Sequence, residues 1–413
     1  MLNDSFLLHI SIDFNYNTTY TNYKIIYKGL VKNMKYYKLI IPNVAMVAVI
    51  YGLSRYTYGL FVPYIRYDFS VSTSVVGLIA SSSYISYMVF TLLVPFLISK
   101  FGPKFPLIFG GIMATVGMFV IGFSQSIIMV AIGVIIAGSS PGLSYPPVPE
   151  IVNHIIKKSK QAKALTIINC GTGIGVFIGG PLALIAGDNW KLAWVLLGII
   201  SFSVTCWNWY IIASIPVQSQ NYKTTSKLQL NWLKDKNKRN LMLLTFLIGI
   251  TTSVYWTYAV DFIVDTGGFT TYESQIFWII MGISGVLGAF GGHFIEMLGI
   301  NKSLLINILG LGISLGLLAI FPSTWIGIAL SAIIFGTFFI MITGIFAVWS
   351  VNIFTDQPSV GYSLVFFLIT CGQFIGPSFM GFIANEINMT TTFIISAIMT
   401  ALTGVFLISK PEK

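Results

Sequence analysis

The stretch PFLISKFGPK, residues 95–104, recurs in altered form as GHFIEMLGINK, residues 292–302. Single coincidences between apolar segments carry little information, but several coincidences at one displacement indicate an internal repeat. The position pairs that share a displacement of 197 residues are Pro95 and Gly292, Ser99 and Glu296, Gly102 and Gly299, Gly52 and Gly249, and Tyr58 and Tyr255. A further stretch, CGTGIGVFIGGP (170–181), returns as CGQFIGP (371–377). The sequence therefore predicts two related halves.

The composition of the chain is typical of a membrane protein. Of its 413 residues, 55% are hydrophobic and only 9% are charged, and the mean hydropathy is +0.84. A water-soluble chain of this composition would lack a polar surface. The three cysteines lie in apolar segments without a CxxC pair, so we expect neither a disulfide framework nor a metal site. The basic residues behind the net charge of +10 lie mainly in loops and ends beside apolar runs, which indicates membrane topology rather than a nucleic-acid partner.

A basic polar segment, PVQSQNYKTTSKLQLNWLKDKNKRN (216–240), lies near the middle of the chain and is typical of a solvated linker. On each side of it the sequence predicts six helices near the ~20 residues needed to cross a hydrocarbon core. The expected spans are 39–62, 72–98, 105–123, 126–152, 164–186, 190–214, 241–263, 274–298, 303–320, 324–350, 360–384 and 391–408. We therefore expect an all-α membrane protein with twelve transmembrane helices in two pseudo-symmetric six-helix halves.

The predicted spans divide the chain into five parts. These are a polar N-terminal tail (1–35), the first half (36–215), the linker (216–240), the second half (241–409) and a C-terminal tail (410–413). The N-terminal tail lacks the uninterrupted apolar core of a signal peptide. A translation start at Met34 is an alternative, because MKYYKL places two lysines directly before the first span, as membrane proteins commonly do.

The basic residues give the predicted bundle an orientation. With the N-terminus in the cytoplasm, most of the 23 Lys and Arg residues fall on the cytoplasmic side, and only Arg66 and Lys191 fall outside. Acidic residues gather on the outer side, among them Asp68 and Asp188. This asymmetry follows the positive-inside rule. We expect a multi-pass protein of the cytoplasmic membrane with both termini in the cytoplasm.

The two repeated turns resemble the signature of the major facilitator superfamily, G-x-x-x-D-[RK]-x-G-[RK]-[RK], which lies between spans two and three and returns more loosely between spans eight and nine. The resemblance covers residues 36–408. In that superfamily the turns are thought to lock helices on the cytoplasmic side during transport. The resemblance assigns this gating role to Ser99, Lys100, Gly102, Lys104, Gly292, Glu296, Gly299 and Lys302. The alternative is that the lysines only anchor the turns to lipid phosphates.

The first span is similar to a narrower group. YGLSRYTYGLFVPYIRYDF, residues 51–69, resembles the pattern G-x-x-R-[FY]-x-Y-x-x-x-x-P-x-[MI]-R-x-[DE] of a largely uncharacterised prokaryotic permease branch. The resemblance to that branch does not identify a substrate. The first turn departs from the superfamily signature, because Pro95 replaces its glycine and Ser99 its acid. The first turn therefore lacks the acid that normally makes a charge contact at this position.

Arg55 is the one basic residue that lies well inside a predicted span rather than at its end. It lies about 24 Å along the helix from Leu39 at 1.5 Å per residue. An arginine at the centre of a membrane helix costs about 2.5–3.5 kcal/mol on insertion scales, so we expect it to face the bundle interior. Our hypothesis is that Arg55 binds an anionic group of the substrate, since a guanidinium makes a two-pronged contact with carboxylate or phosphate. A structural arginine capped by carbonyls is the alternative.

The resemblance also points to further substrate contacts. In the superfamily, spans one, two, five, seven, eight and eleven face a central cavity. The residues that this arrangement would direct there are Tyr58, Tyr84, Asn169, Tyr255 and Gln373. Aromatic side chains in membrane helices more often make core or interface contacts, which is the alternative for the tyrosines.

A proton-coupled transporter normally needs a titratable carboxylate in the membrane. Asp261, near the outer end of the seventh span, is the coupling candidate, and an ordinary solvated carboxylate at the interface is the alternative. Facilitated transport without ion coupling is also open.

The glycine- and proline-rich runs of the fifth and eleventh spans predict close helix packing. Glycine lets two helices approach, and neighbouring helices satisfy the carbonyl that proline leaves free. The residues assigned to packing are Gly171, Gly175, Gly180, Pro181, Gly372, Gly376 and Pro377. The first run partly resembles the antiporter signature of span five, but Val176 breaks its glycine spacing.

These observations favour a secondary transporter. The sequence contains no Walker loop, G-x-x-x-x-G-K-[ST], and no Ser/His, paired-Asp or metal-binding constellation typical of an intramembrane enzyme. We expect a monomeric permease that moves a small organic solute, an organic anion in our hypothesis, by alternating access. We expect no cofactor or metal, and H⁺ is the candidate coupling ion. The alternatives are a multidrug or cation efflux antiporter and a non-transporting membrane sensor.

Overall fold

The computed structural model describes residues 37–71, 73–186, 189–213, 234–355 and 358–407. It divides the chain into two units, residues 1–41 and residues 42–413. Of the first unit, residues 37–41 are described, and they are helical. The predictions for the N-terminal tail, including a start at Met34, for linker residues 216–233 and for the C-terminal tail lie outside the described residues.

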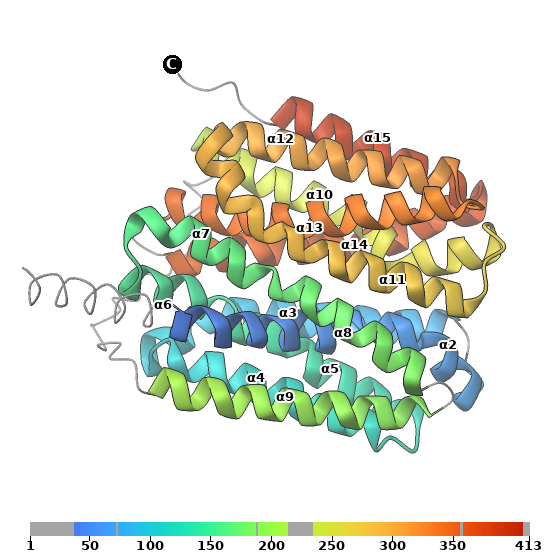
Figure 1. Ribbon diagram of the computed structural model, residues 1–413, viewed down its shortest axis with the longest axis horizontal. Coiled ribbons are helices and arrows are strands. Elements are labelled where there is room, and N and C mark those ends of the chain that lie inside the picture. The colour runs from blue at the N-terminus through green and yellow to red at the C-terminus, as the bar shows by residue number, and fades with distance from the viewer. Residues whose placement is uncertain (1–36, 72, 187–188, 214–233, 356–357, 408–413) are drawn as a thin grey trace, which may run out of the picture. The chain divides into compact units, whose positions relative to one another are not determined.

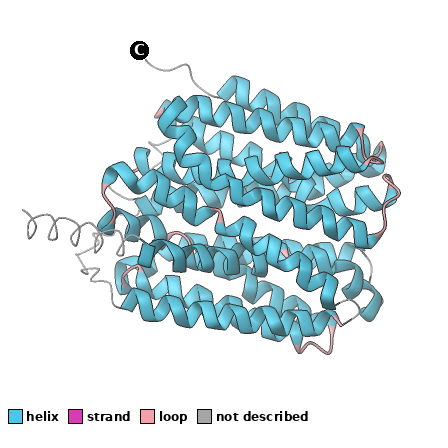
Figure 2. Ribbon diagram, viewed as in Figure 1, coloured by secondary structure: helices cyan, strands magenta, loops and turns pink. Residues whose placement is uncertain are grey.

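Every element within these ranges is a helix, as Figure 2 shows. The elements are η1 (Ala48–Tyr56), α2 (Tyr58–Phe69), α3 (Thr73–Phe101), α4 (Lys104–Gly122), α5 (Ile127–Ser144), α6 (Pro147–Ile155), α7 (Lys158–Asn169), α8 (Gly171–Ala186), α9 (Trp190–Ala213), α10 (Lys236–Asp265), α11 (Thr271–Gly285), η3 (Val286–Phe290), α12 (Gly291–Ile320), α13 (Trp325–Ile353), α14 (Pro358–Glu386) and α15 (Met389–Leu407). In the described part of the chain, ten helices are long and apolar enough to cross a membrane, and a shorter apolar helix is Met389–Val405. The predicted all-α membrane class is confirmed.

Helices far apart in the sequence lie side by side in the unit of residues 42–413 (Figure 1). The α4 helix packs on α5 and α9, and α10 packs on α14 and α15. Three further pairs bring an earlier helix against a later one: α3 against α14, α7 against α13, and α8 against α11. These three pairs form much of the contact between the segments before and after the linker.

The first membrane helix contains a π-helical segment, η1. Short π-helical turns interrupt α-helices mostly at functional sites. Thr57 follows the segment, and its amide and its hydroxyl both donate to the Gly52 carbonyl, at 3.2 and 2.9 Å. Arg55 lies in the last turn of η1, so this local geometry sets the direction of its side chain.

Glycines allow pairs of helices to touch backbone to backbone. A methyl group on Gly175 of α8 would lie against the Ala48 carbonyl oxygen and 2.7 Å from the Gly52 Cα in η1. A methyl group on Gly372 of α14 would meet the Phe246 carbonyl oxygen of α10 in the same way. Gly175 and Gly372 are 197 residues apart. The repeat seen in the sequence therefore extends to helix contacts.

The two repeated turns share a backbone conformation. Gly102 has a φ of +75° and Gly299 a φ of +76°, in the left-handed region that glycine adopts without steric cost. Gly102 lies between α3 and α4. Gly299 interrupts the helical backbone inside α12, and it thereby divides the 49-residue apolar run Tyr272–Ile320. The break falls where the sequence predicts the link between two spans.

Candidate functional site

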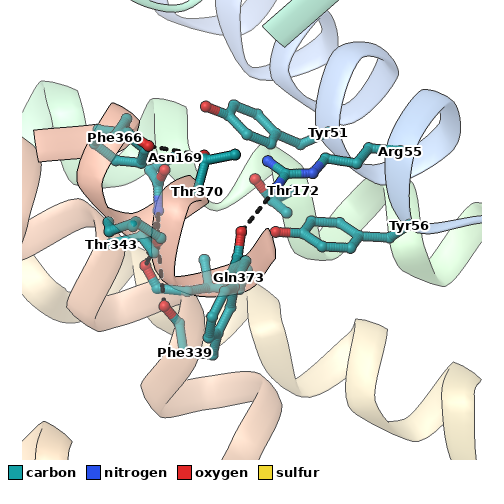
Figure 3. Close-up of a pocket in the computed structure, with 12 residues that line it drawn as sticks. Tyr51, Arg55, Tyr56, Asn169, Thr172, Phe339, Thr343, Phe366, Thr370 and Gln373 are labelled. Carbon is teal, nitrogen blue, oxygen red and sulfur yellow. Dashed lines mark hydrogen bonds between the residues drawn. The ribbon is translucent and has the colours of Figure 1, made fainter. Parts of the chain in front are cut away.

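A small cavity lies among η1, α7, α8, α13 and α14 (Figure 3). Its lining residues are Tyr51, Arg55, Tyr56, Asn169, Thr172, Phe339, Ile340, Thr343, Phe366, Ile369, Thr370 and Gln373. The cavity measures about 20 Å³, which is room for about one water molecule. Ligand pockets commonly measure about 300–1,000 Å³. A solute would therefore bind here only after the surrounding helices had moved apart.

Arg55 extends from η1 toward Gln373 of α14, as Figure 3 shows. Its Nη2 donates a hydrogen bond of 2.7 Å to Gln373 Oε1. This bond joins η1 to α14, although the two residues are 318 positions apart in the chain. The Arg55 Nε is buried without an acceptor among the described residues. Because a guanidinium has five N–H donors, much of its hydrogen-bonding capacity is left for another ligand.

Four tyrosine rings surround the Arg55 guanidinium. Its central carbon lies 4.8 Å from the ring centres of Tyr84 and Tyr87, 5.6 Å from that of Tyr56 and 6.0 Å from that of Tyr51. Aromatic faces attract a cation by about 0.5–2 kcal/mol, depending on its exposure to solvent. The Tyr51 and Tyr87 hydroxyls are in turn 3.1 Å apart. The rings hold the guanidinium in place but do not neutralise its charge.

The charge of the cavity comes from Arg55 alone among the described lining residues, because the others are neutral at neutral pH. Two ion pairs of the described ranges, Lys191 with Asp68 and Lys238 with Asp235, involve no residue that lines the cavity. An isolated charge in a membrane protein interior is costly and generally functional. This site therefore has the chemistry to bind an anion. The described residues hold no cluster of His, Cys, Asp or Glu that could bind a metal ion.

Asn169 lies across the cavity from Arg55 (Figure 3) and joins α7 to α13. Its Nδ2 donates to the Ile340 carbonyl at 2.7 Å and to Thr343 Oγ1 at 2.8 Å. The Tyr145 hydroxyl donates to its Oδ1 at 3.3 Å. Both the oxygen and the nitrogen of the Asn169 amide therefore have hydrogen-bond partners, and the residue connects segments from before and after the linker.

Replacing Asn169 by leucine is expected to lower the free energy of unfolding by about 1–3 kcal/mol, because buried groups on Tyr145 and Thr343 lose their partner. Thermal unfolding of the detergent-purified protein measures the effect. The control is Thr172→Val, which removes a hydroxyl from the same cavity wall while keeping the shape of the side chain. A loss for Asn169→Leu no larger than that for the control would show that these hydrogen bonds do not stabilise the fold.

The predicted substrate contacts are only partly brought together. Those that line the cavity are Arg55, Asn169 and Gln373. Tyr84 does not line it, but its ring covers the Arg55 guanidinium. Tyr58 is buried in the first turn of α2 and does not line the cavity.

The other predicted aromatic contact and the coupling candidate lie on α10 outside the cavity. The Tyr255 ring stacks on Phe335 with ring centres 3.7 Å apart, and its hydroxyl is 2.8 Å from Ser331 Oγ. Tyr255 is thus part of a buried aromatic cluster. Asp261 is exposed near the end of α10.

The predicted gating residues lie in the two repeated turns and the helices beside them. The Gly292 amide donates to Thr166 Oγ1 at 3.2 Å, which places the start of α12 against α7. The Ser99 hydroxyl donates to the Phe96 carbonyl of its own helix at 2.8 Å. The residues exposed in the structure are Lys100, Glu296, Gly299 and Lys302, and those half-buried are Gly102 and Lys104.

The predicted packing residues lie at helix contacts or inside helices. Those at which an added methyl group would meet another helix are Gly171, Gly175, Gly180, Gly372 and Gly376. Pro181 lies inside α8 and Pro377 inside α14. The Pro377 carbonyl accepts a hydrogen bond of 2.8 Å from the Tyr258 hydroxyl of α10.

Some residues of the site were not predicted from the sequence. Tyr51 lies four residues before Arg55 and Thr370 three before Gln373, so helical spacing from those two residues would have found them. Thr343 and Phe339 belong to α13, which is apolar on all sides. No periodicity marks their direction, and only the packing of α13 against α7 places them at the cavity.

Aromatic contacts beside the cavity also join earlier helices to later ones. Tyr56 stacks on Trp256 with ring centres 4.1 Å apart. Tyr145, which holds Asn169, lies 4.9 Å from Tyr362, ring centre to ring centre. The cavity is therefore bounded by contacts that would have to separate before a solute could enter.

Comparison with known proteins shows which family the chain resembles. The family model of the Major Facilitator Superfamily matches residues 44–367. A hexuronate transporter of Bacillus subtilis (strain 168) is 23% identical over 83% of this chain and 86% of its own length. The "Probable sulfoacetate transporter" of Cupriavidus necator is 21% identical over 57% of this chain and 59% of its own length. A purine ribonucleoside efflux pump of Escherichia coli (strain K12) is 20% identical over 83% of this chain and 86% of its own length.

The family match includes most of the cavity, since only the lining residues Ile369, Thr370 and Gln373 lie beyond position 367. The matched range also contains both repeated turns. Because the family model covers most of the chain, the protein belongs to the major facilitator superfamily of membrane transporters.

Proposed function

We propose that the protein is a secondary transporter that moves a small organic anion across the cell membrane by alternating access. The observation that carries this proposal is Arg55, a guanidinium at a cavity whose described lining contains no carboxylate. A carboxylate would neutralise that charge and accept the N–H groups that the described residues leave unused. The substrate carboxylate would compete with Gln373 Oε1 for the Arg55 guanidinium.

The names of two relatives support an anionic substrate. Hexuronates carry one carboxylate, and sulfoacetate carries a carboxylate and a sulfonate, whereas the purine ribonucleosides of the third relative are neutral. Hydroxyl groups of a sugar acid would find partners in Thr172, Thr343 and the amide of Asn169, which line the same cavity. Efflux of cations, the alternative, is opposed by the positive charge of Arg55.

We infer twelve spans arranged as two six-helix halves. Gly299 divides one of the ten long apolar helices into two, and Met389–Val405 is the remaining span. The shared conformation of Gly102 and Gly299 and the matching contacts of Gly175 and Gly372 support two related halves. An even number of spans places both termini on one side, and the distribution of basic residues favours the cytoplasmic side.

Alternating access would follow from opening the cavity on one side at a time. The Asn169 hydrogen bonds to α13 close it at one place, and the stacking of Tyr56 on Trp256 closes it at another. If one set of contacts separates while the other holds, the cavity opens in one direction only. Gating by the repeated turns, proton coupling through Asp261 and action as a monomer belong to the same proposal.

Thermal stability in the presence of matched sugars tests the proposed substrate class. A ligand that binds the native state raises the apparent stability by mass action. Glucuronate and galacturonate are expected to raise the unfolding temperature of the detergent-purified protein. Glucose and galactose, which have the same ring but no carboxylate, are the matched controls. We expect no shift from these two hexoses or from a cationic drug such as tetraphenylphosphonium.

Two outcomes would contradict the proposal. Equal stabilisation by glucose and glucuronate would show that the carboxylate does not matter and would favour a neutral substrate. Stabilisation by tetraphenylphosphonium alone would favour cation efflux, and Arg55 would then be a structural residue.

A further inference from the structure

We infer that the substrate carries a single negative charge, and that Gln373 is the residue that sets this limit. The inference rests on the proposed function and narrows its substrate class from organic anions to monoanions. It follows from the number of charges that the cavity can neutralise, and from the identity of the residue that Arg55 contacts.

The charge inventory of the cavity is short. Among its described lining residues, Arg55 supplies one positive charge, and the rest are tyrosines, threonines, amides and apolar side chains. One carboxylate on Arg55 brings the site to neutrality. A second negative charge on the same solute would lie among neutral lining residues without a second cation, and a buried charge without a charged partner is strongly disfavoured.

The neutral side chain of Gln373 leaves the charge of Arg55 available to a substrate. This side chain is almost completely buried, with 1% of its surface exposed, and its Oε1 accepts the 2.7 Å hydrogen bond from Arg55 Nη2. A glutamate there would place a carboxylate at hydrogen-bond distance from the guanidinium. The chain itself would then neutralise Arg55, and an anionic solute would lose its partner. The neutral amide positions Arg55 while leaving its charge for the substrate.

The surrounding rings limit how the anion approaches. Tyr84 and Tyr87 lie 4.8 Å from the guanidinium carbon, and in Figure 3 Arg55 extends between Tyr51 and Tyr56 toward Gln373. With rings packed around it, the guanidinium makes its hydrogen bond to Gln373 at the edge that points away from η1 into the cavity. One carboxylate fits this edge in a two-pronged contact. The Gln373 side of the guanidinium is therefore where selection by charge occurs.

Acyclic six-carbon compounds that differ only in charge test the inference on the native protein. Glucitol is neutral, gluconate has one carboxylate and glucarate has two. The unfolding temperature of the detergent-purified full chain is measured against the concentration of each. Acetate and sulfoacetate form a second pair with one and two negative charges. We expect each monoanion to bind at least tenfold more tightly than its dianion, and glucitol to give no shift.

The results separate this inference from the proposed function. If glucarate or sulfoacetate binds as tightly as its monoanionic partner, the single-charge limit is wrong, while transport of organic anions stands. If neither these four anions nor the hexuronates stabilise the protein, the proposed function fails, and the inference fails with it.

A charge variant tests the role of Gln373 directly. Gln373→Glu is expected to weaken gluconate binding at least tenfold without lowering the unfolding temperature of the protein alone, because the introduced carboxylate would pair with Arg55. The matched control is Gln275→Glu, the same change at a residue that is 4% exposed and lies away from the cavity on α11. Gluconate binding by Gln373→Glu at the wild-type level would overturn the inference. If either variant fails to fold, the ligand series on the wild-type protein still tests the single-charge limit.

Discussion

Replacing Arg55 by methionine is expected to abolish stabilisation by glucuronate while leaving the protein alone at least as stable as the wild type. Loss of one partner of a buried charged contact costs about 2–5 kcal/mol, which corresponds to a loss of affinity of at least about 30-fold. The charge itself costs about 2.5–3.5 kcal/mol in the membrane interior, and its contacts with the tyrosine rings return part of that cost. Methionine fills a similar space without the charge, so the variant should unfold at the same or a higher temperature.

The sign of the stability change distinguishes a binding arginine from a structural one. An arginine that holds helices together would lower the unfolding temperature when removed, whereas an arginine kept for a ligand would not. Arg55→Lys keeps the charge but loses the planar fork, so we expect weakened rather than abolished binding. The control is Lys191→Met, which removes a half-exposed cation paired with Asp68. Full stabilisation of Arg55→Met by glucuronate would show that the anion binds elsewhere.

The second large effect concerns Gly175, where alanine is expected to lower the free energy of unfolding by about 1–3 kcal/mol or more. The added methyl group would collide with backbone atoms of Ala48 and Gly52. Backbone cannot move aside as a flexible side chain can, so α8 would have to shift away from η1. Because η1 carries Arg55, binding of glucuronate should weaken as well. Thermal unfolding with and without glucuronate measures both effects.

Two other glycines complete this experiment. Gly59→Ala is the control, because a methyl group at Gly59 in α2 would have no neighbour within 4 Å, and alanine favours a helix by about 1 kcal/mol over glycine. Gly372→Ala should behave as Gly175→Ala does, because its methyl group would meet the Phe246 carbonyl. Equal stabilities of the Gly59 and Gly175 variants would contradict the close helix contact.

The fold class could be predicted because the requirements of a lipid environment are visible in composition. Runs of apolar residues near the length of a bilayer leave helices as the simplest solution, and basic turns mark where the chain leaves the membrane. The bend at Gly299 was also predictable, since Gly102 repeats it in the first half. The π-helical form of η1 was not, because it arises from packing and carries no periodicity of its own.

The site could be predicted where a residue is out of place for its surroundings. Arg55 in an apolar span pointed to the cavity, and the family resemblance added Asn169 and Gln373. Thr343 gave no signal, because a hydroxyl in an apolar helix is common and its direction depends on how α13 packs on α7. Tyr255 has the same residue type as Tyr56, yet it lies in the aromatic cluster at Phe335. Residue type predicts the chemistry of a side chain, whereas helix rotation decides its location.

Uptake of radiolabelled glucuronate into proteoliposomes that contain the purified protein tests the central claim most directly. The account predicts saturable uptake that excess unlabelled glucuronate inhibits, that glucose does not inhibit, and that Arg55→Met abolishes. Uptake no greater than that of protein-free liposomes, or uptake that glucose inhibits as strongly as glucuronate does, would contradict it.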